Sequence, residues 1–297
     1  MLDVANADLL PVWSQSTRHS LLFPLCMIQA KHLLFTAAAI VVGGILLHRR
    51  ALSQRKKRRV INDGKPRVCL CASGSVAAVK VPELAELLMQ KQIRVDVVLT
   101  EAAAFFQKVD YKGTTPWSKL EALCSQCDED GVPWVEVWCD QDEWSHYESV
   151  KDDQVVHIEL AKRSQVLLFA PLSANTLGQV ANGLSTNLLT SLARAWYYDM
   201  NDELAGGLKI KYGAQLSKPV LAAPAMNTYM YYQRVTAQHL ATLKARGIQI
   251  VDPVEKKLAC GDFGTGALAA PDVIVAQVAA ALLQYQEAVA GMPVFQP

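Results

Sequence analysis

The sequence predicts an α/β fold, a single doubly wound parallel sheet with helices on both faces. Short apolar runs typical of buried strands alternate with longer segments whose apolar positions recur at helical spacing. Alternation of this kind produces right-handed βαβ units, in which the strands lie parallel. Polar and glycine-bearing segments also follow several of the apolar runs, where such sheets bind their ligands.

Residues 67–72 (RVCLCA) form the first expected strand, and the Ser73-Gly74-Ser75 turn ends it. A helix is expected over 76–90, because its apolar residues recur every three or four positions and Pro82 lies in its first turns. A second strand is expected at 95–99, followed by an alanine-rich helix that reaches Phe106.

Residues 107–153 are less regular, and we expect one strand inside them at 135–138. Two stretches, 108–138 and 197–217, are interpreted as surface insertions of unknown role, since neither interrupts a motif.

The remaining elements follow in the same alternation. We expect helices at 157–163, 175–194, 229–246 and 273–285, and strands at 166–170, 220–223 and 248–251. Residues 259–269 are expected to form a glycine-rich loop. The whole pattern favours a Rossmann-like or flavodoxin-like arrangement.

Composition excludes several classes of protein. The 297 residues are 51% hydrophobic and 19% charged with a net charge of +1, which is too apolar for a disordered chain. Residues 1–59 carry nine Lys or Arg against two acids, whereas 60–297 carry 20 against 26. A mildly acidic body argues against general nucleic-acid binding.

An N-terminal extension, 1–64, precedes the predicted folded domain at 65–297. It contains an uncharged apolar segment, 33–47, followed by a basic linker, the order found in membrane anchors whose C-terminal side is cytoplasmic. A membrane tether, a targeting presequence and a disordered extension all remain open. In each case we expect the domain at 65–297 to be cytoplasmic.

The seven cysteines are irregularly spaced, which favours a reducing compartment over a disulfide framework. Cys124-x-x-Cys127 is half of a zinc site, a redox pair or an exposed loop pair. We favour the loop pair and expect no metal.

Polar residues follow four expected strands, at 73–75, 100–101, 171–176 and 224–227. The carboxyl ends of parallel strands share one edge of a sheet, so these segments predict a ligand site there.

Ser73-Gly74-Ser75-Val76 suits a phosphate at a helix start, or is an ordinary capped turn. Taken alone, His157 has either a structural or a catalytic role. Asn227 is either a turn residue or a ligand of a carboxylate. Cys260 lies in a segment with three glycines, which is typical of a mobile flap.

Six segments in this order resemble the homo-oligomeric flavin-containing cysteine decarboxylases: ASGSVAA, VVHIEL, APLSANTLG, LLTSLARAW, PAMNTYMYY and KKLACGDFGTGALA. The resemblance covers roughly residues 66–285. It implies FMN as the cofactor and a homotrimer with sites at subunit interfaces. It also implies His157 as the active-site base, Asn227 as the ligand of the substrate carboxylate and Cys260 as the proton donor. The FMN-binding positions that it implies are Gly74, Ser75, Val76, Thr100, Phe106, Ser173, Ala174, Asn175, Thr176 and Ala225.

The implied activity is FMN-dependent decarboxylation of 4'-phospho-N-pantothenoyl-L-cysteine to 4'-phosphopantetheine and CO2 in coenzyme A biosynthesis. Oxidation of the carbon that bears sulfur places the carboxylate β to a C=S group, so that CO2 can leave as charge delocalises. The electrons then return, and the reaction is redox neutral.

Two departures from the family pattern are visible: Tyr231 stands where a tryptophan is usual, and Ala102 replaces a serine of some members. Two other functions of the same fold remain open, a non-catalytic subunit resembling phosphatase inhibitors and a peptidyl-cysteine decarboxylase.

Overall fold

The computed structural model describes residues 63–145, 147, 149, 153–200, 217–257, 261 and 263–291. The predicted extension therefore lies outside the described residues, except for Asp63 and Gly64, and so does its apolar segment 33–47.

Six parallel strands form the central sheet, in the order β3-β2-β1-β4-β5-β6. They are β1 (Arg67–Ala72), β2 (Arg94–Leu99), β3 (Val135–Cys139), β4 (Val166–Leu172), β5 (Val220–Pro224) and β6 (Gln249–Ile250). The prediction of a doubly wound sheet is confirmed, and the order is that of a Rossmann-type sheet. The strand order reverses between β1 and β4, so a crevice is expected at their carboxyl ends.

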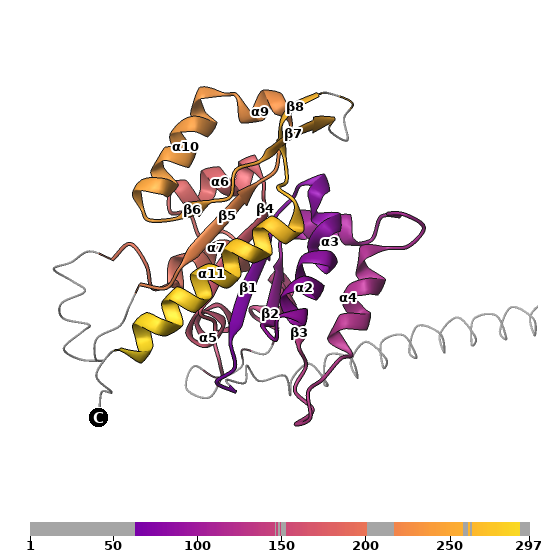
Figure 1. The fold of residues 1–297 in the computed structure, drawn as a ribbon, viewed down its shortest axis with the longest axis vertical. Helices are drawn as coiled ribbons and strands as arrows, with labels where there is room; N and C mark the ends of the chain where they lie inside the picture. The colour runs from indigo at the N-terminus through magenta and orange to yellow at the C-terminus, as the bar shows by residue number, and fades with distance from the viewer. Residues whose placement is uncertain are drawn as a thin grey trace, which may run out of the picture. The chain divides into compact units, whose positions relative to one another are not determined.

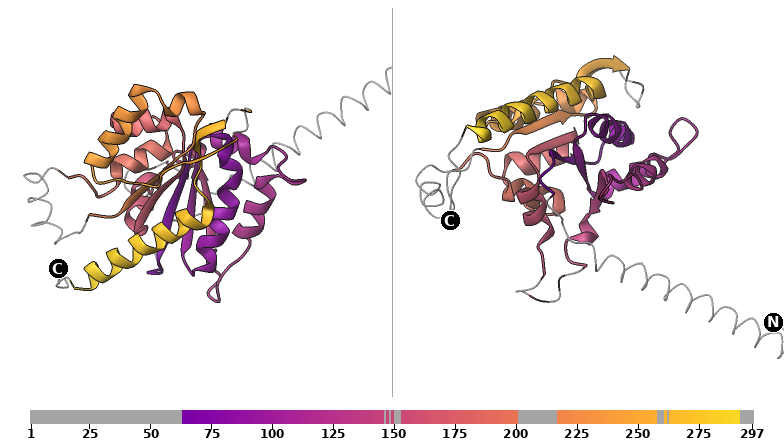
Figure 2. Two further views of the ribbon diagram at one scale, coloured as in Figure 1. Left: turned by 45° about the horizontal axis from the view of Figure 1, so that its top comes forward. Right: turned by 60° about the horizontal axis from the view of Figure 1, so that its bottom comes forward.

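Helices cover both faces of this sheet (Figures 1 and 2). On one face lie α2 (Val81–Gln90), α4 (Pro116–Cys124) and α11 (Pro271–Ala290). On the other lie α5 (Val156–Arg163), α6 (Ala174–Ala181), α7 (Leu188–Ala195) and α10 (Arg234–Ala245). Strand β1 shows why both faces are apolar: Val68 and Leu70 enter one core, and Cys69 and Cys71 the other. Burial raises the pKa of the Cys69 thiol well above its usual value.

Two long helices that the periodicity predicts are each divided in the structure. The expected helix 175–194 breaks after α6, where Gly183 adopts a φ of +69° and Asn187 starts α7 with a capping box to Thr190. The expected helix 229–246 is a short α9 (Thr228–Tyr231) followed by α10, because Gln233 is extended. Apolar periodicity continues across both breaks and so conceals them.

The stretch 108–138 is more than a surface insertion. Its helix α4 places Leu120 and Leu123 in the core beside α2, and β3 pairs with β2 as an edge strand. The expected helix 76–90 begins as a 3-10 turn, η1 (Val76–Lys80), before α2.

Helix α11 is long and apolar enough to cross a membrane by length and composition. Its Ile274, Val275 and Val278 are buried in the sheet core, so one face of it is part of the domain.

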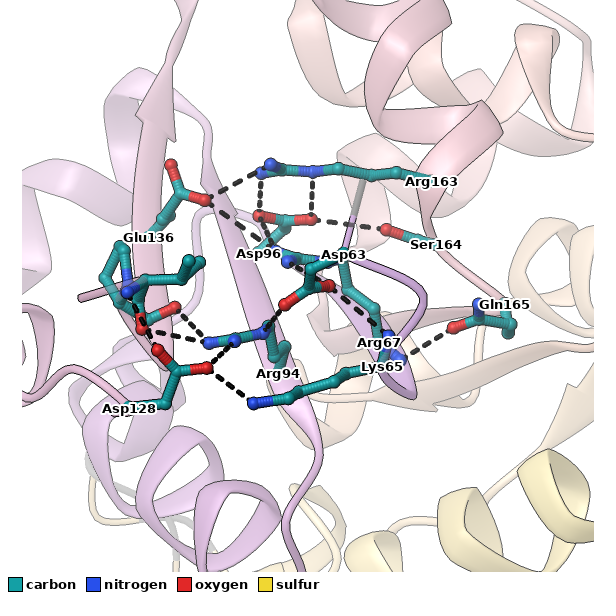
Figure 3. A network of polar contacts seen from close by, with 12 residues as sticks. Asp63, Lys65, Arg67, Arg94, Asp96, Asp128, Glu136, Arg163, Ser164 and Gln165 are labelled. Atoms are coloured by element: carbon teal, nitrogen blue, oxygen red, sulfur yellow. Dashed lines mark hydrogen bonds and ion pairs between the residues drawn. The ribbon is translucent and has the colours of Figure 1, made fainter. Parts of the chain in front are cut away.

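A buried ion network closes the amino ends of β1 and β2 (Figure 3). At its centre, Asp96 of β2 is fully buried and accepts hydrogen bonds from Arg163 Nε at 2.9 Å and from Ser164 Oγ at 3.3 Å. Arg67 lies 3.5 Å away on β1. Each buried charge is thereby paired, as burial requires.

The same network ties down the start of the domain. Asp128, in the loop before β3, accepts hydrogen bonds from Lys65 and Arg94 at 2.5 Å each, and Asp63 pairs with Arg67 and Arg94 (Figure 3). The hydrogen bond from Lys65, the Val132 N–H and the Arg94 guanidinium hold the pKa of Asp128 well below its usual value.

Candidate active site

The carboxyl ends of β1 and β4 are tied together at the point where the strand order reverses. The N–H and hydroxyl groups of Ser73 both donate to the Pro171 carbonyl at 3.0 Å. The same hydroxyl accepts from the N–H of Ser173 at 2.8 Å. Ser73 is 1% exposed, so it is a structural link between the two strand ends, and the residues after it form the site.

Each of these strand ends, and that of β2, leads into a helix, and the residue just before the helix caps it with its side chain. Ser75 accepts from the Ala77 N–H before η1, and Ser173 accepts from the Thr176 N–H before α6. Thr100 accepts from the Ala103 N–H before α3 (Glu101–Gln107). These caps explain the polar residues at the sheet edge, and they fix the backbone of the turns.

A cavity of about 540 Å3 opens at this edge. Its described lining residues come from the turn after β1 and η1, from α3 and the loop after it, from the segments that follow β4 and β5, and from 256–268: Gly74, Ser75, Val76, Ala77, Val79, Lys80, Phe106, Tyr111, Ser173, Ala174, Asn175, Ala225, Met226, Asn227, Met230, Lys256, Gly266, Ala267 and Leu268. Its size and its mixture of apolar walls with a few polar groups are typical of a cofactor site.

A hairpin forms one side of the cavity. It consists of β7 (Val254–Lys257) and β8 (Phe263–Ala267), so part of the expected loop 259–269 is a strand. Gly266 permits a close approach: its φ is +137°, and a Cβ there would clash with the carbonyl oxygen of Met226. The Met226 N–H donates to the Gly266 carbonyl at 2.9 Å, and Tyr232 donates to Thr265 at 3.1 Å.

Asn227 lies three residues after the end of β5 and lines the cavity. Its Oδ1 accepts from the Tyr229 N–H at 2.8 Å, so it caps α9. This contact fixes the orientation of the amide. Nδ2 is the donor of the amide, so a hydrogen bond to a carboxylate would come from that atom.

The structure brings together most of the predicted site residues, but not all of them. Gly74, Ser75, Val76, Phe106, Ser173, Ala174, Asn175, Ala225 and Asn227 line the cavity. Thr100, the N-cap of α3, and Thr176, in the first turn of α6, are both buried and are not among its lining residues. Cys260 lies between β7 and β8 in the chain, outside the described residues.

His157 is also absent from the described lining of the cavity. It lies at the start of α5, where its Nδ1 is 2.5 Å from Oε1 of Glu143. A single chain thus assembles the cavity without this histidine.

Sequence reasoning missed several lining residues. Lys256 is the first residue of the recognised segment that contains Cys260, so its place in that segment could have marked it as a site residue. Tyr111 lies in the 108–138 stretch, where no pattern distinguishes a cavity residue from a surface one. A second cavity, of about 360 Å3, adjoins Gln165 and Lys218 before β4 and β5, away from this edge. Among the residues that the structure describes, no cluster of three metal-ligating side chains occurs.

The chain is similar to known proteins in both sequence and fold. The family described as Flavoprotein matches residues 56–283. Phosphopantothenoylcysteine decarboxylase of Oryza sativa subsp. japonica is 39% identical over 211 residues, 71% of this chain and 78% of the rice protein. The protein of that name from Mus musculus is 39% identical over 222 residues, 74% of this chain and 89% of the mouse protein.

Two solved structures extend the similarity to the fold. A PPC decarboxylase mutant complexed with pantothenoylaminoethenethiol has a TM-score of 0.55 and 38% identity, over 73% of this chain and 97% of that one. The FMN binding protein AtHal3 has a TM-score of 0.54 and 37% identity, over 75% of this chain and 98% of that one. The chain belongs to the flavoprotein family, and it is similar to members named phosphopantothenoylcysteine decarboxylase.

Proposed function

We propose that the chain catalyses the FMN-dependent decarboxylation of 4'-phospho-N-pantothenoyl-L-cysteine to 4'-phosphopantetheine and CO2 in coenzyme A biosynthesis. The observation that carries this proposal is the cavity at the β1–β4 edge, which joins Gly74–Val76, Ser173–Asn175 and Asn227 in a chain similar to enzymes of that name.

The residues present fit FMN. Val76, Phe106 and Ala225 offer apolar contact to a flat ring, and Ser75, Ser173 and Asn175 offer hydroxyl and amide groups at its edges. Gly74 leaves space beside Ala102, because a Cβ on Gly74 would lie 2.6 Å from the Ala102 Cβ. FMN supplies a reversible two-electron acceptor for the carbon that bears sulfur.

The charge of the cavity suits an anionic substrate. Lys80 and Lys256 line it, and none of its described lining residues is acidic. The substrate carries a carboxylate and a phosphate. We assign the carboxylate to the Asn227 amide and the substrate phosphate to Lys256, which is exposed on the hairpin.

His157 and Cys260 complete the proposed chemistry. The His157 imidazole accepts the thiol proton, because a ring nitrogen with a lone pair can act as a general base. Cys260 returns a proton to carbon at the end of the reaction. Since His157 is not in the described lining of its own chain's cavity, we propose a homotrimer in which a neighbouring subunit supplies it.

For the N-terminal segment 33–47 we propose a membrane tether. Fractionation of cells that express full-length protein or residues 60–297 tests it: only the full-length chain should sediment with membranes and resist a salt wash.

The enzymatic proposal is tested on the purified full-length protein. A yellow protein that releases CO2 from phosphopantothenoylcysteine is expected, and a Cys260→Ser variant should release CO2 and accumulate the unsaturated thiol. A colourless protein that takes up no added FMN would refute the proposal. A peptide ending in cysteine, assayed in parallel, tests the peptidyl-cysteine alternative.

A further inference from the structure

The imidazole of His157 is paired with a carboxylate from another part of the chain. Its Nδ1 lies 2.5 Å from Oε1 of Glu143, fourteen residues earlier. The Glu143 side chain is 6% exposed and that of His157 is 21% exposed. The carboxylate is therefore sheltered, whereas part of the ring remains accessible to a ligand.

The turn that carries Glu143 is held at several points. Glu143 directly follows the 3-10 turn η2 (Asp140–Asp142), and its N–H donates to the Asp140 carbonyl at 3.3 Å. The Asp142 carboxylate accepts from the Cys139 N–H at 2.8 Å, and Asp140 accepts from the Leu188 N–H at 2.9 Å. The turn is thus fastened to β3 and to the start of α7.

Stability does not account for the placement of this carboxylate. The second oxygen, Oε2 of Glu143, is buried and has no hydrogen-bond partner among the described residues. A buried carboxylate oxygen without a partner destabilises a fold. Repulsion from acidic neighbours adds to this destabilisation. The pKa of Asp140 is raised by burial and also by the charges of Glu101 and Glu143.

We propose that Glu143 is a positioning residue that holds His157 in the tautomer with its proton on Nδ1. The carboxylate accepts the Nδ1–H, and Nε2 keeps its lone pair for the substrate thiol. When the S–H bond breaks, its proton forms the new Nε2–H bond, and the ionised Glu143 stabilises the resulting imidazolium. Glu143 itself takes up no proton. This inference rests on the proposed function, since that function makes His157 the base.

Ring-nitrogen NMR on full-length protein labelled with 15N-histidine tests the arrangement directly. We expect His157, assigned by the signal that disappears in His157→Gln, to carry its proton on Nδ1 in the wild type. In Glu143→Gln we expect a shift towards the Nε2–H form or a mixture, because the amide can also act as a donor. A wild-type His157 with its proton on Nε2 would overturn the proposal.

Kinetics test the consequence. Glu143→Gln should lower kcat by about 100-fold with a much smaller change in KM and with FMN still bound, and Glu143→Asp should recover part of the loss. The matched control is Glu159→Gln. Glu159 lies on α5, the helix that carries His157, and its carboxylate pairs with Lys162. Wild-type kcat in Glu143→Gln, or no recovery in Glu143→Asp, would overturn the positioning role.

The two proposals fail in different ways. If the wild type binds FMN but decarboxylates nothing, the proposed function is wrong and the role of Glu143 in that reaction falls with it. If the wild type is active but the tautomer of His157 does not depend on Glu143, only the positioning role is wrong.

Discussion

At Asn227 the side-chain carbonyl caps α9, and the amide lines the cavity, so one side chain serves both local structure and the proposed substrate contact. Asn227→Asp separates the two roles, because aspartate caps a helix equally well but repels a carboxylate. We expect kcat/KM to fall about 100-fold, with the melting temperature and FMN content unchanged. Steady-state kinetics and the visible spectrum measure this, and a variant with wild-type kcat/KM would contradict the assignment.

Lys256 tests the charge of the cavity. Lys256→Gln should raise KM about tenfold for the phosphorylated substrate and leave KM for unphosphorylated pantothenoylcysteine unchanged, because a single charged contact is lost. Lys91→Gln, at the exposed end of α2, is the matched control. Equal effects on the two substrates would show that Lys256 does not contact the phosphate.

The β7–β8 hairpin is the element that depends most on glycine. Gly266→Ala should loosen the hairpin from the segment of Asn227, because its φ of +137° and the nearby Met226 carbonyl leave no room for a methyl group. We expect kcat/KM to fall and FMN to dissociate faster, measured by flavin fluorescence. Gly291→Ala, at the end of α11 with a φ of −81°, is the control and should behave as wild type.

Elements also show how far sequence reasoning reaches. All six strands of the sheet were predicted from short apolar runs. The signal is clearest in β4, which is buried along its whole length and apolar throughout. The breaks at Gly183 and Gln233 do not follow, because the apolar period continues through them. Nor does the hairpin, whose strand β8 is rich in glycine and therefore resembles a loop.

Part of the site could be predicted from the sequence, and part could not. Positions within three residues of a strand's carboxyl end, such as Ser75 and Asn227, are placed at the sheet edge by topology alone. The contact between Glu143 and His157 joins an irregular segment to a helix, and nothing in local periodicity indicates it. Tyr111 and Lys256 reach the cavity through tertiary packing of a loop and a hairpin.

At the scale of the whole molecule, the ion network at the amino ends of the strands sets the response to acid. The pKa of Asp128 is held well below its usual value of about 4, so its contribution to stability is present above pH 4 and is lost as the pH falls through the folded-state value. Asp128→Asn should lower the urea midpoint at pH 7, and the difference from wild type should shrink below about pH 4. Asp130→Asn, an exposed neighbour, is the control. A difference that does not vary with pH would contradict the argument.

The proposed trimer makes a prediction that no single chain can satisfy. His157→Ala and Asn227→Ala should each be inactive alone, because each removes one side of the same active site. If a site takes Asn227 from one subunit and His157 from the next, every hybrid trimer that contains both variants will have one intact site among its three. Co-expression with two affinity tags and tandem purification isolates these hybrids. Restored CO2 release supports a site shared between subunits, since each chain then repairs its neighbour. Complete inactivity of stable hybrids would mean that both residues must come from one chain, and α5 would then have to approach the cavity of its own subunit.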